Sequence, residues 1–136
     1  MYQSQAKLVY GTVYAIPREI GPVDIALVSS ILLHLRDPFY ALENALRLTR
    51  ETVIVTEPID DNMQVDSGEA RMIFNPDAQT GKPNDTWWTL SPELVKRFLA
   101  VLGFEDVTVS YHTQVFEKTR QIPHYTLVAH RTKGRV

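Results

Sequence analysis

The stretch VDIALVSSILLHLRDPFYALENALRLTRETVIVTEP, residues 23–58, decides the fold. It opens with a nearly continuous apolar run, Val23–Val28, which is typical of a strand covered on both faces in a parallel sheet. The pair Asp37-Pro38 then supplies a capping carboxylate and a first-turn proline, and predicts a helix that runs to about Leu48. The β-branched run Thr52–Thr56 predicts the next buried strand. Strand, helix and strand in this order form a right-handed crossover, so this part of the sheet is predicted to be parallel.

Other segments extend this unit on both sides. Lys7–Tyr14 mixes apolar and small polar residues and is interpreted as a further strand. Ser91, followed by proline, begins a second predicted helix that ends at Gly103. Val107–Val115 and Tyr125–Val128 are predicted strands, and the short connection between them makes them antiparallel neighbours.

Residues 59–89 form a long connection rich in proline, glycine and polar residues. Ordinary connections are about 2–6 residues long, so this segment is interpreted as a substrate-binding or lid insertion within a single domain, residues 1–136. Glu69–Phe74 could form a short helix in it, and Trp87-Trp88 is an aromatic anchor for its end.

Composition excludes several classes of protein. Lys and Arg number 14 against 16 Asp and Glu, giving a net charge of −2 with both signs scattered, so DNA is a disfavoured partner. No apolar run approaches the roughly 20 residues of a membrane span. The start of the chain lacks the features of a secretory signal, and there is no cysteine, so a cytoplasmic location is expected.

The order of parts in residues 23–58 resembles the middle of class I S-adenosylmethionine (SAM)-dependent methyltransferases. The shared features are small residues ending a strand, an apolar LxHLxDP turn, a helix with AL pairs, and a strand closing in EP. The later string WWTLSPELVKRFLAVLGFEDVTV looks like the last helix, GF corner and sixth strand of that family. The resemblance extends from Gly11 to Val128. It implies a Rossmann-like three-layer α/β fold, with a partial sheet in which the antiparallel last strand inserts between its neighbours.

The resemblance also implies that part of the cofactor site is missing. The family holds the methionine and ribose of SAM with a glycine-rich loop and an acidic residue, and neither is found before Ala6. The chain is therefore interpreted as the C-terminal portion of a methyltransferase, expected to bind SAM weakly or not at all alone.

Ligands of open parallel sheets bind at the carboxyl ends of the strands, and three such ends are present. At the first, the resemblance implies contact of Thr12 and Val13 with adenine. At the second, the small side chains of Ser29 and Ser30 allow close approach of the ligand, and Ile31 could line the adenine or sulfonium pocket. These five residues are the predicted cofactor-binding set.

His34, Glu57, Trp87 and Trp88 are the candidate substrate-binding residues. His34 could take a proton near neutral pH, but the favoured interpretation is that it bonds a backbone carbonyl. Glu57 ends a buried strand and either points into the cleft or is a solvated loop carboxylate. Trp87 and Trp88 could bind a cationic or flat substrate, although core packing is favoured for one of them. The position of Asp37 is explained by helix capping.

No catalytic residue is predicted. No metal site is predicted either, because the remaining histidines lie apart along strands without paired carboxylates. The leading hypothesis is methyl transfer from SAM to a small molecule or a tRNA base in the complete protein, with this chain inactive alone. The alternative is a non-catalytic, self-associating α/β module. In either case the strands Val23–Val28 and Lys7–Tyr14 would lack partners, so a homodimer or higher homo-oligomer is expected, unless Lys7–Tyr14 caps the bare edge within one chain.

Overall fold

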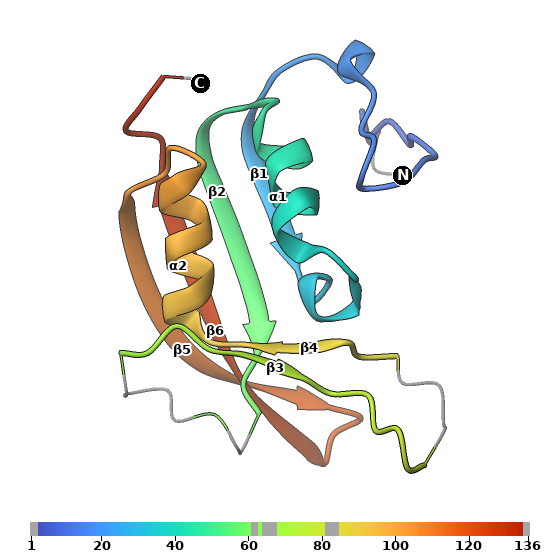
Figure 1. The fold of residues 1–136 in the computed structure, drawn as a ribbon. Coiled ribbons are helices and arrows are strands. Elements are labelled where there is room, and N and C mark those ends of the chain that lie inside the picture. Colours follow the sequence, from blue (N-terminus) through green and yellow to red (C-terminus); the bar gives the residue numbers. More distant parts are fainter. Residues whose placement is uncertain (1–2, 61–62, 64–67, 81–84, 135–136) are drawn as a thin grey trace.

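The computed structural model describes residues 3–60, 63, 68–80 and 85–134 (Figure 1). The strands and helices include most of the predicted ones, in the predicted order along the chain. They are η1 (Arg18–Ile20), β1 (Val23–Ser29), η2 (Leu32–His34), α1 (Pro38–Leu46), β2 (Thr49–Pro58), β3 (Met72–Phe74), β4 (Trp88–Leu90), α2 (Pro92–Val101), β5 (Asp106–Phe116) and β6 (Arg120–His130).

The main sheet has the strand order β1-β2-β6-β5. β1 runs parallel to β2, and β6 is antiparallel to both β2 and β5. The α/β class, the parallel crossover and the insertion of the last strand between its neighbours are therefore confirmed. Val53 lies opposite Ala129 and Val55 opposite Leu127, which places these four side chains on one face of the sheet.

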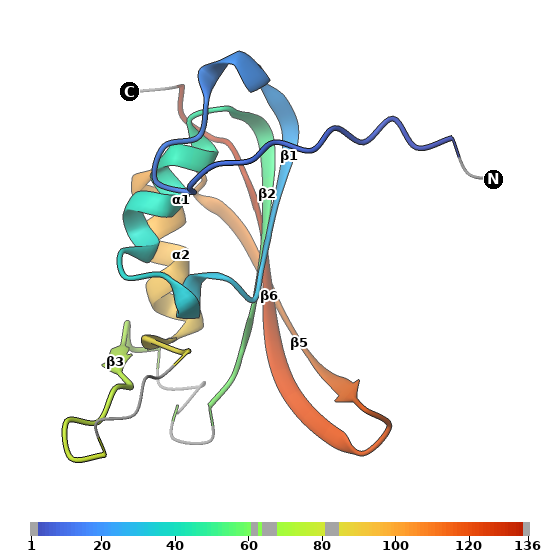
Figure 2. The same cartoon turned by 90° about the vertical axis from the view of Figure 1, so that its right-hand side faces the viewer.

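Both α1 and α2 cover this one face (Figure 2). Between them and the sheet lies the hydrophobic core of buried side chains, which comprises Leu32, Leu42, Leu46, Val53, Val55, Leu90, Val95, Leu99, Phe104, Tyr125, Leu127 and Ala129. Of the three layers expected, the described residues supply two. As a result β1 has one uncovered face and is not covered on both faces, and Ile25 and Leu27 are 60% and 69% exposed. The strand order also places β1 at the edge of the sheet.

The strand predicted at Lys7–Tyr14 is wrong. These residues belong to no strand, and Lys7 to Tyr10 are exposed. A run with β propensity needs a neighbouring strand to bond, and none lies beside this segment in the described part of the chain. Tyr14 is held instead by side-chain contacts: its ring stacks on that of Tyr40 at 6.0 Å, and its hydroxyl accepts a hydrogen bond from the Asp37 N–H.

The short helix predicted at Glu69–Phe74 is also wrong, because Met72–Phe74 forms β3 and pairs antiparallel with β4. The deciding contacts are distant in sequence: Phe74 lies opposite Trp88, with ring centroids 5.1 Å apart. The proposed insertion, residues 59–89, includes 61–62, 64–67 and 81–84, which lie outside the described residues.

The β5–β6 hairpin is longer than the sequence predicts. β6 begins at Arg120 because the hairpin extends past the end of β2, where Pro58 faces His124. Its turn is tight, and Glu117 and Lys118 both have positive φ, at 49° and 65°.

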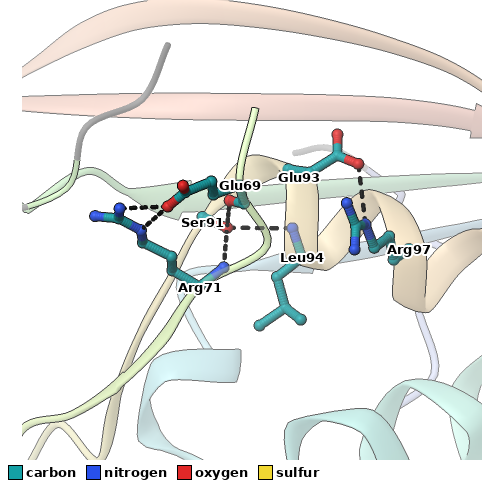
Figure 3. Close-up of polar contacts among 6 residues, drawn as sticks. All are labelled: Glu69, Arg71, Ser91, Glu93, Leu94 and Arg97. Atoms are coloured by element: carbon teal, nitrogen blue, oxygen red, sulfur yellow. Dashed lines mark hydrogen bonds and ion pairs between the residues drawn. The ribbon is translucent and has the colours of Figure 1, made fainter. Parts of the chain in front are cut away.

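Ser91 joins α2 to the segment that leads into β3 (Figure 3). Its Oγ caps the helix by accepting a hydrogen bond from the Leu94 N–H at 3.2 Å. The same oxygen accepts from the Arg71 N–H at 2.8 Å and donates to the Glu69 carbonyl at 3.0 Å. One buried hydroxyl thus positions the helix that covers β6 and the β3–β4 hairpin at the end of the sheet.

Ser91→Ala is expected to lower the free energy of unfolding by about 2 kcal/mol, because it removes a helix cap and leaves two further backbone groups without their partner. Urea denaturation followed by circular dichroism measures the change. The matched control is Arg97→Gln, which removes an exposed ion pair with Glu93 on the same helix and should cost less than about 0.5 kcal/mol. Equal effects of the two substitutions would contradict this role of Ser91.

Candidate functional site

Two cavities lie at the carboxyl ends of β1 and β2, on either side of the turn at residues 31–33. The first has a volume of about 420 Å³ and opens between α1 and the end of β1. Its walls are almost entirely apolar and consist of Val13, Ile16, Leu27, Val28, Ser29, Ile31, Leu32, Leu35, Ala41, Leu42 and Ala45. Apolar walls of this kind suit the two faces of a flat heterocycle.

Three of the five predicted cofactor residues line this first cavity: Val13, Ser29 and Ile31. Thr12 and Ser30 do not. The Thr12 hydroxyl accepts a hydrogen bond from the Tyr14 N–H, and its side chain is exposed. Ser30 lies at the end of β1, where the backbone turns with a φ of 47°. Its N–H donates a hydrogen bond to the Thr56 carbonyl.

The segment that brings Val13 to the cavity is tied to α1. Besides the contacts of Tyr14, the Arg47 guanidinium donates a hydrogen bond to the Ile16 carbonyl at 2.6 Å. The segment therefore lies beside β1 and α1 without joining the sheet.

Glu57, near the end of β2, fixes the turn between the two cavities. Its Oε1 accepts hydrogen bonds from the Ile31 N–H at 3.1 Å and the Leu32 N–H at 2.9 Å. The side chain is only 1% exposed, so it is not the solvated loop carboxylate that the sequence left open. Its second oxygen, Oε2, is buried and has no hydrogen-bond partner among the residues that the structure describes.

Burial raises the pKa of Glu57 from 4.5 to about 7. The N–H groups of Leu32, Ile31 and Leu33, together with the nearby His34, favour the charged form and oppose this shift. The carboxyl group can therefore exchange a proton near neutral pH, which suits a general acid or base.

The second cavity has a volume of about 500 Å³ and lies between the end of β2, the β3–β4 hairpin and β6. It is more polar than the first. Its lining residues are Leu33, Glu57, Pro58, Ile59, Asp60, Asn75, Thr86, Trp88, Thr89, Leu90, Arg120 and Ile122.

Of the four candidate substrate-binding residues, Glu57 and Trp88 line this second cavity, whereas His34 and Trp87 do not. His34 Nδ1 contacts the Asp85 carbonyl, the type of contact expected of a structural histidine. The Trp87 N–H donates to the Leu33 carbonyl, and its ring lies 4.9 Å from the Arg36 guanidinium. His34 and Trp87 thus attach the hairpin to the turn that Glu57 holds.

Several residues at the second cavity had no signal in the sequence. Asn75, Thr89 and Arg120 reach the second cavity through strand pairings that local patterns do not reveal. Tyr125 is fully buried opposite Glu57, and burial and the Glu57 charge raise its pKa well above 10. Its hydroxyl therefore stays protonated and donates to the Leu90 carbonyl at 3.0 Å.

Asp37 caps α1 as predicted, because its Oδ1 accepts a hydrogen bond from the Tyr40 N–H. In the described part of the chain no group of three or more His, Asp or Glu side chains is placed to bind a metal ion. None of the helices found there is long and apolar enough to cross a membrane.

The raised pKa of Glu57 predicts a pH dependence of stability. Between about pH 4.5 and 7 the folded state binds more protons at this site than the unfolded state, so the free energy of unfolding should fall as the pH rises. The total fall is about 3 kcal/mol, and it is complete above pH 7. Glu57→Gln should remove this component, whereas Glu51→Gln, at an exposed position of the same strand, should retain it.

Chemical denaturation at several pH values between 4 and 8 measures these differences. A pH dependence in the Glu57→Gln variant equal to that of the unsubstituted chain would show that another group is responsible.

No protein-family model and no curated protein matches this sequence. Solved structures are similar in fold. The N-terminal domain of EvdMO1 with SAH bound is 17% identical, with a TM-score of 0.59 over 93% of this chain and 54% of that one. A magnesium protoporphyrin IX methyltransferase from Synechocystis PCC 6803 with bound SAH is 10% identical, with a TM-score of 0.56 over 90% and 49%.

The [4+2]-cyclase SpnF is also similar, at 15% identity and a TM-score of 0.57 over 91% of this chain and 56% of that one. The chain thus spans about half the length of these structures. At such identities the likeness concerns the fold, and a fold can host more than one reaction. The chain has the mixed α/β fold found in SAM-dependent methyltransferases.

Proposed function

We propose that this chain forms the adenine and acceptor sides of a SAM-dependent methyltransferase site, and that the complete protein transfers a methyl group to a small-molecule acceptor. The observation that carries the proposal is the pair of cavities at the carboxyl edge of the sheet, one apolar and one polar, separated by a single turn. Methyl transfer needs this division, because the donor and the acceptor must be held on opposite sides of the moving group.

The first cavity fits part of the cofactor. Val13, Ile31 and Leu42 offer apolar surface to the faces of a purine, and Ser29 offers a hydroxyl at the rim. No carboxylate is among its described lining residues, so the charged acceptor that would bind the ribose hydroxyls most strongly is missing there. SAM, when bound, would supply an activated methyl group, and this chain would hold its base.

The acceptor side is the second cavity. A small molecule is favoured over a tRNA base because the net charge of −2 does not favour the binding of phosphates. Glu57 and Trp88 would contact this acceptor, and His34 and Trp87 would position the turn beside it.

This assignment predicts weak and localised binding of SAH to the chain alone. Without partners for the ribose and methionine, several charge-assisted hydrogen bonds of about 1.5–3 kcal/mol each are lost, so the Kd should be millimolar. Two-dimensional NMR with SAH and with adenosine should show shifts at Val13, Ile31 and Ala45. Ala45→Phe, which fills the cavity, should abolish them, whereas Val101→Phe, on the exposed side of α2, should not.

Micromolar binding in titration calorimetry would contradict the incomplete site. Shifts that persist in the Ala45→Phe variant would contradict the assigned cavity.

A second candidate function, self-association without catalysis, is favoured by the uncovered side of β1. Leu27 lies in one row with Ile54 and Val128 on the sheet face away from the helices, and Ile25, two residues earlier in β1, is on the same face. Every second backbone N–H and C=O of β1 also points away from β2. No lysine or proline interrupts this strand, and its charged residue, Asp24, sits near the start. We propose that a second copy of the chain covers this surface in a homodimer or larger assembly.

Light scattering coupled to gel filtration should therefore give a mass of at least twice 15.5 kDa. Ile25→Lys combined with Leu27→Lys should yield the monomer, because two buried charges would oppose the contact. Val101→Lys is the control, since it introduces a charge at a 71% exposed apolar position on α2. A concentration-independent monomer of the unsubstituted chain would rule the assembly out.

A further inference from the structure

The N-terminal arm, residues 3–10, carries apolar side chains that are largely exposed. Leu8, Val9 and Tyr10 are 78%, 51% and 86% exposed. Among the residues that the structure describes, no hydrogen bond joins this arm to the sheet. Figure 2 shows the arm projecting past the sheet on the side away from α1 and α2. Adjacent apolar residues with such exposure are typical of a segment that contacts another molecule.

The arm is joined to the fixed part of the chain at Gly11. The segment that follows begins with a turn, in which the Ala15 N–H donates to the Thr12 carbonyl at 3.0 Å. Tyr14 and Ile16 then attach this segment to α1 through the ring stacking and the hydrogen bond described above. The start of the arm is therefore held in place, whereas the arm itself can change direction at a glycine.

The free edge of β1 offers backbone groups to such an arm. The Ser30 N–H donates to the Thr56 carbonyl of β2. Because successive backbone groups of a strand point to opposite sides, those of Ile25, Leu27 and Ser29 point away from β2. An edge of this kind can bind an extended segment through main-chain hydrogen bonds.

The arm and the edge match in length and in side chains. An extended arm of residues 3–10 spans about 26 Å, and β1 is about 23 Å long. In a strand, Leu8 and Tyr10 share one face. That face can lie beside Ile25 and Leu27, on the side of the sheet away from the helices. The exposed apolar residues of the arm and of β1 would then bury one another.

The position of the arm favours pairing between two copies of the chain. Val13 lines the first cavity together with Leu27 and Val28, so the arm starts beside the end of its own β1. When two free edges face each other across a twofold axis, the start of each arm lies close to the edge of the other copy, and both arms exchange through the same contact. The arm does not pair with its own β1 in this structure, which leaves the edge open to a second copy.

We infer that the arm, residues 3–10, of one chain adds a strand to the free edge of β1 in a second copy, and that the two copies exchange their arms. This inference rests on the self-association proposed above and names the segment that produces it. Leu27 also lines the first cavity, so the exchanged arm lies along the wall of that cavity. The predicted adenine site is then shared between two chains.

Paramagnetic NMR on mixed chains tests the exchange. The chain has no cysteine, so Leu8→Cys provides a single site for a spin label. When spin-labelled chains without isotope are mixed with isotope-labelled unsubstituted chains, the amide signals of Ile25, Leu27 and Ser29 should be lost. The same label at Val101→Cys, on the exposed side of α2, should leave these signals intact. Signal loss only when the label and the isotope are on one chain would show that the arm covers its own β1, and would overturn the inference.

Light scattering coupled to gel filtration gives an independent test. Leu8→Lys combined with Tyr10→Lys should raise the dissociation constant of the assembly at least about a hundredfold, because two charges would replace buried apolar side chains. The matched control is Gln3→Lys combined with Gln5→Lys, which adds the same charge to the polar part of the arm and should change the constant less than about threefold.

The outcome is separable from that of the proposed self-association. An assembly that persists unchanged in the variant with Leu8→Lys and Tyr10→Lys would overturn the exchange of arms and leave self-association standing, because Ile25→Lys with Leu27→Lys tests the β1 surface separately. A concentration-independent monomer of the unsubstituted chain would overturn both.

Discussion

The backbone N–H groups of Ile31 and Leu32 donate hydrogen bonds to one buried oxygen of Glu57, and both cavities depend on this contact. It joins the end of β2 to the turn that follows β1, at the point where the parallel pair ends. Without it, the turn would leave two N–H groups unpaired close to the core, where water cannot replace the carboxylate. The walls of the first cavity at Ile31 and of the second at Leu33 are therefore set by the same side chain.

The turn at residues 31–33 also positions the rest of the site. Its Leu33 carbonyl accepts the Trp87 N–H, and the following residue, His34, contacts the Asp85 carbonyl. Arg36 provides a carbonyl for the Trp88 indole and a guanidinium beside Trp87. These contacts attach the β3–β4 hairpin to the sheet edge, while Ser91 attaches the same hairpin to α2 from the other side. Trp88 is thus held by several independent bonds, which is the rigidity that a binding wall requires.

How well the sequence predicts each part of this structure depends on how far apart in the sequence the interacting residues lie. The crossover of residues 23–58 is predictable because its signals are local: an apolar run, a cap with proline, and a β-branched run. The strand order required the resemblance to a known family, since pairing of β6 with β2 leaves no local pattern. The predictions for Lys7–Tyr14 and Glu69–Phe74 are wrong because these segments are held by contacts with Tyr40 and Trp88, which are distant in the sequence. The location of Glu57 was predictable from its place at a strand end, but its two N–H partners and its unpaired oxygen were not.

Placing the ionisable group in the wall between two cavities has an energetic consequence. Burial makes the ionised Glu57 costly, and the two N–H bonds recover only part of that cost, so its pKa stays near 7. A purely structural connection between β2 and the turn would be stronger with both carboxylate oxygens satisfied. Asn or Gln could also accept the same two bonds without burying a charge. A buried carboxylate with one oxygen left without a partner in the described part of the chain is therefore a cost to the stability of the fold, and this cost accompanies the contact that holds the turn.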